Sequence, residues 1–135
     1  MTQFRKVTEG LSVSPQITTE EAKAAAATGF RLIINNRPDG EQPGQPTSAD
    51  MEAAVRAVGA DYLFNPIVGR PTPDQSKAQR EAVAAASGPV LAFCRSGTRS
   101  ITTWAMGEAA SGRRTVEEII RAAAAAGYDL GPAPG

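Results

Sequence analysis

The sequence contains no histidine among its 135 residues, and this absence limits the chemistry that it can perform. A serine–histidine–aspartate triad, a cysteine–histidine pair and the commonest zinc sites all need an imidazole. Any catalysis by this chain would therefore rest on cysteine, arginine, carboxylates, hydroxyls or backbone groups.

Cysteine, long apolar runs and net charge are also scarce or absent. The one cysteine, Cys94, cannot form an intramolecular disulfide, and segment 1–10 lacks the apolar core of a signal peptide. No apolar run approaches the roughly 20 residues that span a bilayer. The formal net charge is zero, unlike the strongly basic balance of a nucleic-acid binder or a polybasic membrane patch. These features predict a cytoplasmic protein without nucleic-acid or membrane partners.

What is present is the composition of an ordinary globular domain. The hydrophobic fraction is 41% and the charged fraction 21%, and the length falls in the usual range for one domain. No internal repeat and no linker divides the chain. We expect one domain over residues 1–130, followed by a disordered tail at 131–135.

Segments typical of strands alternate with segments typical of helices. Proline, glycine and capping-box spacings separate them, the last at Thr18 with Glu21, Thr72 with Gln75 and Thr115 with Glu118. The sequence predicts strands at 10–14, 30–36, 61–68 and 89–93, and helices at 18–28, 49–58, 73–86, 100–110 and 115–126. This alternation predicts an α/β fold with a mainly parallel sheet, in which ligands bind beyond the carboxyl ends of the strands.

The segment CRSGTRS, residues 94–100, follows the last predicted strand and opens a helix. Loop N–H groups and the positive end of the helix dipole would converge there on a volume that suits an anion. Gly97 permits a tight backbone turn, and Arg95 and Arg99 add positive charge that can grip an oxyanion. The predicted anion-binding residues also include Ser96, Thr98 and Ser100.

The same positive surroundings favour the thiolate form of Cys94, which would make it a nucleophile without a histidine base. The alternative is a structural one: a free cysteine after a strand is often a small buried hydrophobe, and arginines often serve surface solubility. The glycine and arginine that follow Cys94 favour the nucleophile.

Four segments together resemble a known bacterial family. CRSGTRS, FRLIINNRPDGE, QPTSADMEAAVRAVG and NPIV look like the phosphatase-like domain of beta-lactamase hydrolase-like proteins, also described as a sulfur-transferase family. The resemblance implies a fold similar to dual-specificity protein tyrosine phosphatases, with a four- to five-stranded, mostly parallel sheet and a cysteine thiolate on an anion-binding loop. Members occur alone or fused to a persulfide-dioxygenase-like metallo domain, so the resemblance also suggests a persulfide dioxygenase as a partner.

The spacing of the loop departs from the phosphatase pattern. Four residues separate Cys94 from Arg99, one fewer than in the protein tyrosine phosphatase signature, and Phe93 stands where that pattern has histidine. Rhodanese-type sulfurtransferase loops match the spacing better. A smaller ring of N–H groups suits a persulfide sulfur, whereas a phosphoryl group has three equatorial oxygens to hold.

A phosphatase of this type would also need a general acid. The family pattern points to the loop after NPIV, where the acid is Asp74, although Asp74 also suits the first turn of a helix. Asp39, at the end of the strand over 30–36, is the other candidate, with a simple Pro-Asp-Gly turn as its alternative. Arg37, in the same loop, would add positive charge at the mouth of the site.

The spacing and the sparse acids favour sulfur transfer over phosphate hydrolysis. Cys94 would attack the outer sulfur of thiosulfate or a persulfide, and the leaving sulfite or thiolate needs no general acid. Because the chain has no second cysteine, an external thiol, sulfite or cyanide would accept the sulfur. A phosphatase that forms a phosphocysteine on a phosphorylated substrate, and a non-enzymatic anion-binding module, are the alternatives. No cofactor and no metal are expected.

Overall fold

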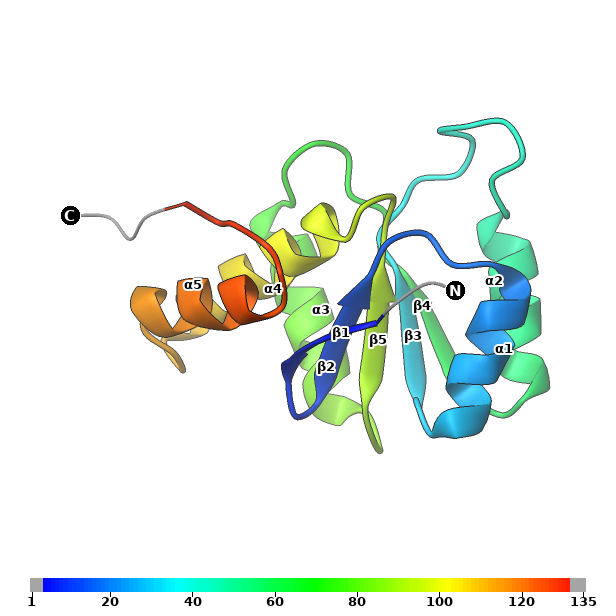
Figure 1. Ribbon diagram of the computed structural model, residues 1–135, viewed down its shortest axis with the longest axis horizontal. Coiled ribbons are helices and arrows are strands. Elements are labelled where there is room, and N and C mark those ends of the chain that lie inside the picture. Colours follow the sequence, from blue (N-terminus) through cyan, green and yellow to red (C-terminus); the bar gives the residue numbers. More distant parts are fainter. Residues whose placement is uncertain (1–3, 132–135) are drawn as a thin grey trace.

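The computed structural model describes residues 4–131, which form a five-stranded sheet with helices on both faces (Figure 1). The strands are β1 (Arg5–Thr8), β2 (Leu11–Ser14), β3 (Leu32–Asn35), β4 (Asp61–Phe64) and β5 (Val90–Phe93). Their order in the sheet is β1-β2-β5-β3-β4, and all pairs are parallel except β1 with β2. The predicted mostly parallel sheet is confirmed.

Apolar side chains leave the two faces of the sheet alternately and are covered by different helices. The helices are α1 (Thr19–Thr28), α2 (Ser48–Ala57), α3 (Pro73–Ala85), α4 (Thr98–Ser111) and α5 (Val116–Ala125). Ile33 and Leu91 pack in one core with α1 and α2, while Ile34 and Ala92 pack in the other with α4 and α5. Figure 1 shows α1 and α2 on one side of the sheet and α3, α4 and α5 on the other. Successive strand residues point to opposite faces, which is why both cores form.

Local sequence signals explain where most helices begin. The capping boxes predicted at three helix starts are present: Thr18 with Glu21, Thr72 with Gln75, and Thr115 with Glu118. Each threonine side chain accepts the backbone N–H three residues on, and each glutamate or glutamine reaches back to the threonine N–H. These bonds satisfy backbone donors that a helix N-terminus otherwise leaves without partners.

The structure differs from the sequence prediction at one edge strand, in the length of two other strands and at the start of one helix. The edge strand β1, which pairs antiparallel with β2, was missed, because its exposed residues carry no apolar alternation. The strands over 30–36 and 61–68 are shorter than predicted, and the second ends at Phe64, before Pro66. Helix α4 begins at Thr98 and not at Ser100, because Gly97 takes a positive φ of 96° and serves as its N-cap.

The predicted tail and the absence of a membrane-spanning segment were further expectations from the sequence. Residues 132–135 of the predicted tail lie outside the described residues. Within residues 4–131, no helix has the length and apolar character needed to cross a membrane.

Candidate active site

Cys94 stands directly after β5, at the carboxyl end of a central parallel strand. Figure 1 shows that the chain segments following β3, β4 and β5 leave the sheet at this same edge. The Cys94 side chain is fully buried, and its Sγ accepts the backbone N–H of Gly97 at 3.1 Å. The cysteine therefore lies where open parallel sheets bind ligands, with one loop amide already directed at its sulfur.

The cysteine loop is tightly closed around Gly97. The backbone N–H of Thr98 donates to the Ser96 hydroxyl at 3.3 Å, and that hydroxyl lies 3.0 Å from the Thr98 side-chain oxygen. The positive φ of Gly97 disfavours any side chain, and a Cβ at this position would overlap the Tyr128 hydroxyl. Glycine is thus required here both for the turn and for the close approach of Tyr128.

Arg99, in the first turn of α4, is held by a carboxylate from the loop after β3. Its Nη1 and Nη2 donate to Oε2 and Oε1 of Glu41, both at 2.8 Å, and Nη1 also donates to the Ile67 carbonyl at 3.0 Å. The hydrogen bond with Glu41 raises the pKa of Arg99, and the interaction of Arg99 with Cys94 adds to the effect. Arg99 therefore lies next to the sulfur with its guanidinium fixed by two-point binding.

Glu41 is the shared partner of two arginines. Besides Arg99, it accepts the Nε–H of Arg37 at 2.9 Å. Hydrogen bonds from Arg99 first, and also from Arg37, lower the pKa of Glu41 from 4.5 to about 2. Glu41 is therefore ionised at neutral pH and carries no proton to donate.

Arg37 lies beneath the site and does not line its mouth. Its side chain is only 2% exposed, and its Nη1 and Nη2 donate to the side-chain oxygens of Gln16 and Gln42 at 3.0 and 3.1 Å. All three of its nitrogens are thus engaged within the protein. Arg37 therefore does not supply the positive charge that the sequence predicted at the mouth of the site. It is buried and helps to hold Glu41, the carboxylate that binds Arg99.

Ser100 belongs to a buried polar network behind the loop. Its hydroxyl donates to Oδ1 of Asn36 at 2.8 Å. The Asn36 amide donates in turn to Oε1 of Gln79 at 2.7 Å and to the Asn65 carbonyl at 2.9 Å. These bonds tie the first turn of α4 to the chain after β3 and to α3, so they fix the position of the cysteine loop.

Within residues 4–131, the side chains of the remaining predicted residues make no hydrogen bond with Cys94, Arg99 or Glu41. Arg95 is exposed, and its side chain makes no hydrogen bond or ion pair with any residue over 4–131, while its carbonyl accepts the Gln16 N–H at 3.1 Å. Asp39 accepts the Ser48 N–H at 2.8 Å, which favours a structural role in the loop before α2. Asp74 lies in the first turn of α3, beside Gly107 and Met106 of α4.

Sequence reasoning missed two residues that the fold brings to the cysteine loop. Glu41 follows Asp39 by two positions, in the loop where the sequence suggested Asp39 as a general acid and Arg37 as a positive charge. Tyr128 comes from the segment after α5, and its hydroxyl donates to the Ser96 carbonyl at 3.1 Å. Burial first, and then the electrostatic interaction with Cys94, raise the pKa of Tyr128. No local signal in the sequence marks either contact.

Solved structures of phosphatases share the fold of this chain. The chain resembles a candidate phosphatase from Neisseria meningitidis with a TM-score of 0.82 and 37% identity, covering 93% of this chain and 89% of that one. Tk-PTP in its active form aligns with a TM-score of 0.72 and 18% identity, covering 92% of this chain and 84% of that one. The predicted fold of protein tyrosine phosphatases is therefore confirmed.

Comparison of sequences identifies the family. Beta-lactamase hydrolase-like proteins of Xylella fastidiosa and Agrobacterium fabrum are 40% and 39% identical over 128 and 127 residues. The chain spans only 30% and 29% of the length of these relatives, although the alignments cover 94% and 93% of the chain. Residues 3–111 match the family model for the phosphatase-like domain of beta-lactamase hydrolase-like protein. The chain belongs to this family, as the resemblance of its sequence implied.

Proposed function

We propose that this chain is a cysteine-dependent phosphatase that moves a phosphoryl group from a phosphate monoester to Cys94 and then to water. The observation that carries the proposal is the placement of Arg99, whose guanidinium is fixed by Glu41 beside the sulfur of Cys94. Membership of a phosphatase-like family and the likeness to solved phosphatases support phosphate over other anions. This reverses the preference that the spacing of the loop suggested.

The reaction follows from the groups on the loop. The Cys94 thiolate attacks phosphorus, the bond to the ester oxygen breaks, and the alcohol or phenol leaves with the bonding electron pair. Arg99 and the loop amides stabilise the charge on the phosphoryl oxygens. Water then attacks the phosphocysteine, releasing inorganic phosphate and the thiolate. Because Cys94 is fully covered in this structure, the substrate must displace part of the cover, which includes Tyr128.

The surrounding carboxylates determine which substrates are suitable. Glu41 is ionised and bound to Arg99, Asp39 is bonded to Ser48, and Asp74 lies on α3 beside the second half of α4. We infer from these contacts that the reaction proceeds without a carboxylic acid that protonates the leaving oxygen. We therefore expect aryl phosphates, whose phenolate leaves without a proton, to react much faster than alkyl phosphates.

Sulfur transfer is the second candidate, and a specific observation favours it. The short loop directs the Gly97 N–H at the sulfur itself, an arrangement that suits a persulfide, and sulfite or a thiolate leaves without a proton. Thiosulfate or a persulfide would donate the sulfur and an external thiol would accept it. A persulfide dioxygenase as partner remains a proposal on the same footing.

One experiment distinguishes the two candidates. Wild type and Cys94→Ser are compared in the hydrolysis of an aryl phosphate, and separate samples are incubated with thiosulfate before intact-mass analysis. Phosphatase activity that requires Cys94, without a stable added sulfur atom, supports the proposal. A sulfur adduct on Cys94 with no phosphate release would favour sulfur transfer. If neither phosphate release nor a sulfur adduct occurred, the non-enzymatic anion-binding module would be the alternative that stands.

A further inference from the structure

A cavity of about 470 Å³ lies between α3, α4 and α5. It is set apart from Cys94, because it lies along the second half of α4, from Trp104 onward, whereas the cysteine loop precedes the start of this helix. Its floor includes Leu11, which pairs with Val90 at the opposite end of the central strands from Cys94. The lining residues are Leu11, Gln79, Arg80, Val83, Ala84, Trp104, Glu108, Arg113, Arg114 and Glu118.

The charged side chains that line this cavity differ in whether they have a hydrogen-bond or ion-pair partner. Glu118 is engaged in the capping box with Thr115, whose backbone and side chain lower its pKa. Glu108 pairs with Arg114 only at 3.9 Å. Over residues 4–131, the side chains of Arg80 and Arg113 make neither a hydrogen bond nor an ion pair. Arg80 and Arg113 thus border the cavity without ion pairs of their own, and with Arg114 they outnumber the two lining carboxylates, Glu108 and Glu118.

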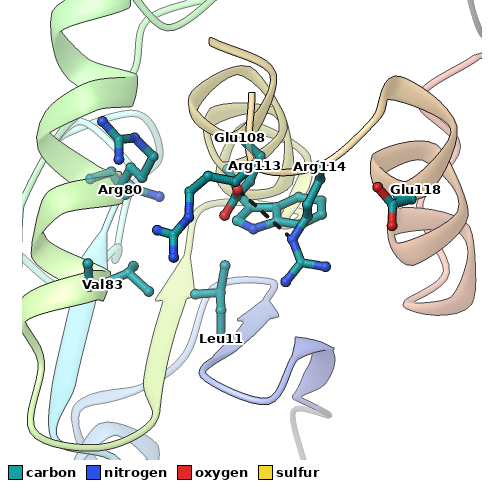
Figure 2. Close-up of a pocket in the computed structure, with 10 residues that line it drawn as sticks. Leu11, Arg80, Val83, Glu108, Arg113, Arg114 and Glu118 are labelled. Atoms are coloured by element: carbon teal, nitrogen blue, oxygen red, sulfur yellow. Dashed lines mark ion pairs between the residues drawn. The ribbon is translucent and has the colours of Figure 1, made fainter. Parts of the chain in front are cut away.

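The arginine side chains extend toward the apolar lining of the cavity. Figure 2 shows Arg113 and Arg114 extending from the α4–α5 connection toward Leu11, while Glu118 lies apart on α5. Apolar side chains complete the cavity: Leu11 from β2, Val83 and Ala84 from α3, and the buried Trp104 from α4. A cavity that joins an apolar floor to a few convergent polar groups is the usual form of a small-molecule site.

We propose that this cavity binds a small organic anion. Its oxyanion group is held by Arg80 and Arg113, which can donate two parallel hydrogen bonds each, and its apolar body lies against Leu11 and Trp104. This site is separate from the Cys94 site and does not depend on the reaction proposed there. Binding should therefore persist when the nucleophile is removed.

The chain carries its own reporter for this site, because Trp104 is its only tryptophan. We would titrate the full chain with anilinonaphthalene sulfonate, an aromatic anion, and follow both Trp104 fluorescence and the fluorescence of the dye. Saturable quenching of Trp104 is expected. The uncharged phenylnaphthylamine of similar size should bind at least about tenfold more weakly, because it lacks the charged group that hydrogen-bonds to arginine.

Matched variants test which residues hold the anion. Arg113→Gln and Arg80→Gln should each weaken binding of the sulfonate by about tenfold, the usual loss for one charge-assisted hydrogen bond. Arg121→Gln removes an exposed arginine of α5 that does not line the cavity and should change nothing, as should Cys94→Ser. The proposal is overturned if no saturable quenching occurs, if Arg113→Gln and Arg121→Gln bind equally well, or if Cys94→Ser abolishes binding.

Discussion

The arginines at the two ends of helix α4 differ in whether a carboxylate of the protein binds them. At its start, Arg99 and the buried Arg37 share the carboxylate of Glu41, with donor–acceptor distances of 2.8 to 2.9 Å. At its end, Arg113 and the neighbouring Arg80 of α3 make no ion pair within residues 4–131. The charge near the nucleophile is fixed by the protein, while the charge at the far end is open to a ligand.

This difference shows what a reactive site requires beyond positive charge. A guanidinium that is already oriented pays little conformational entropy when an oxyanion forms beside it, and it costs no reorganisation during the reaction. The requirement is a counter-charge that keeps the arginine in place, and Glu41 supplies it. Arginines without a protein partner suit reversible binding instead.

Replacing the nucleophile gives the largest expected effect and separates the two ends of the helix most sharply. Cys94→Ser should lower the turnover of an aryl phosphate by about a thousandfold or more, since covalent catalysis depends on this one atom. Steady-state kinetics measure the loss. Binding of anilinonaphthalene sulfonate at the far cavity should be unchanged in the same variant, and turnover that survived the substitution would contradict the account.

Neutralising Glu41 should destabilise the fold, because it leaves the buried Arg37 without its counter-charge. The pKa of Glu41 falls from 4.5 to about 2 on folding. Because solvent screens this partly exposed carboxylate, we expect its ion pairs to contribute about 1 kcal/mol of stability. Because the folded-state pKa is the lower one, this contribution is fully present above pH 4.5 and is lost as the pH falls toward 2.

Urea unfolding at several pH values measures this contribution. Glu41→Gln should be less stable by about 1 kcal/mol at pH 7 and should lose less stability than wild type between pH 4.5 and 2. Glu9→Gln, which changes an exposed carboxylate paired with Lys6, is the matched control and should behave as wild type. Equal stability of Glu41→Gln and wild type at neutral pH would refute the stabilising role of Glu41.

Replacing an arginine by lysine at each end of α4 tests whether the fixed geometry of the guanidinium matters for catalysis. Arg99→Lys keeps the charge but loses the two-point contact with Glu41, and we expect kcat/KM for an aryl phosphate to fall by about a hundredfold. Arg113→Lys, at the other end of the helix, should leave kcat/KM unchanged. Equal losses in the two variants would show that only the overall positive charge of the protein matters.

The smallest expected effect concerns Tyr128. Tyr128→Phe removes the hydrogen bond from its hydroxyl to the Ser96 carbonyl while keeping the ring, so the free energy of unfolding should fall by about 1 kcal/mol. Thermal unfolding detects such a change. A loss several times larger would mean that Tyr128 supports the cysteine loop through more than this bond.

The sequence predicted the features that depend on neighbouring residues. The three capping boxes and the position of Cys94 after a buried strand follow from short-range rules, and the structure contains them. The start of α4 was misplaced by two residues because Gly97, interpreted as a loop glycine, serves as the N-cap itself.

The features that complete the site depend on contacts between distant segments. The bond between Arg99 and Glu41 joins residues 58 positions apart, and that between Tyr128 and Ser96 joins residues 32 positions apart. Neither has a local signature, because it arises only when the loop after β3 and the segment after α5 fold onto the cysteine loop. Similarly, Arg37 seemed suited to the mouth of the site, and only the fold shows that it is buried.

The central claim, that Cys94 receives a phosphoryl group beside the fixed Arg99, has one direct test. Wild-type protein is mixed rapidly with an aryl phosphate, quenched in acid and analysed by intact mass, followed by mapping of the peptide that contains Cys94. The account predicts a transient adduct with the mass of one phosphoryl group on Cys94 in wild type, and none in Cys94→Ser. Phosphate release by wild type with no adduct on Cys94 at any quench time would contradict it.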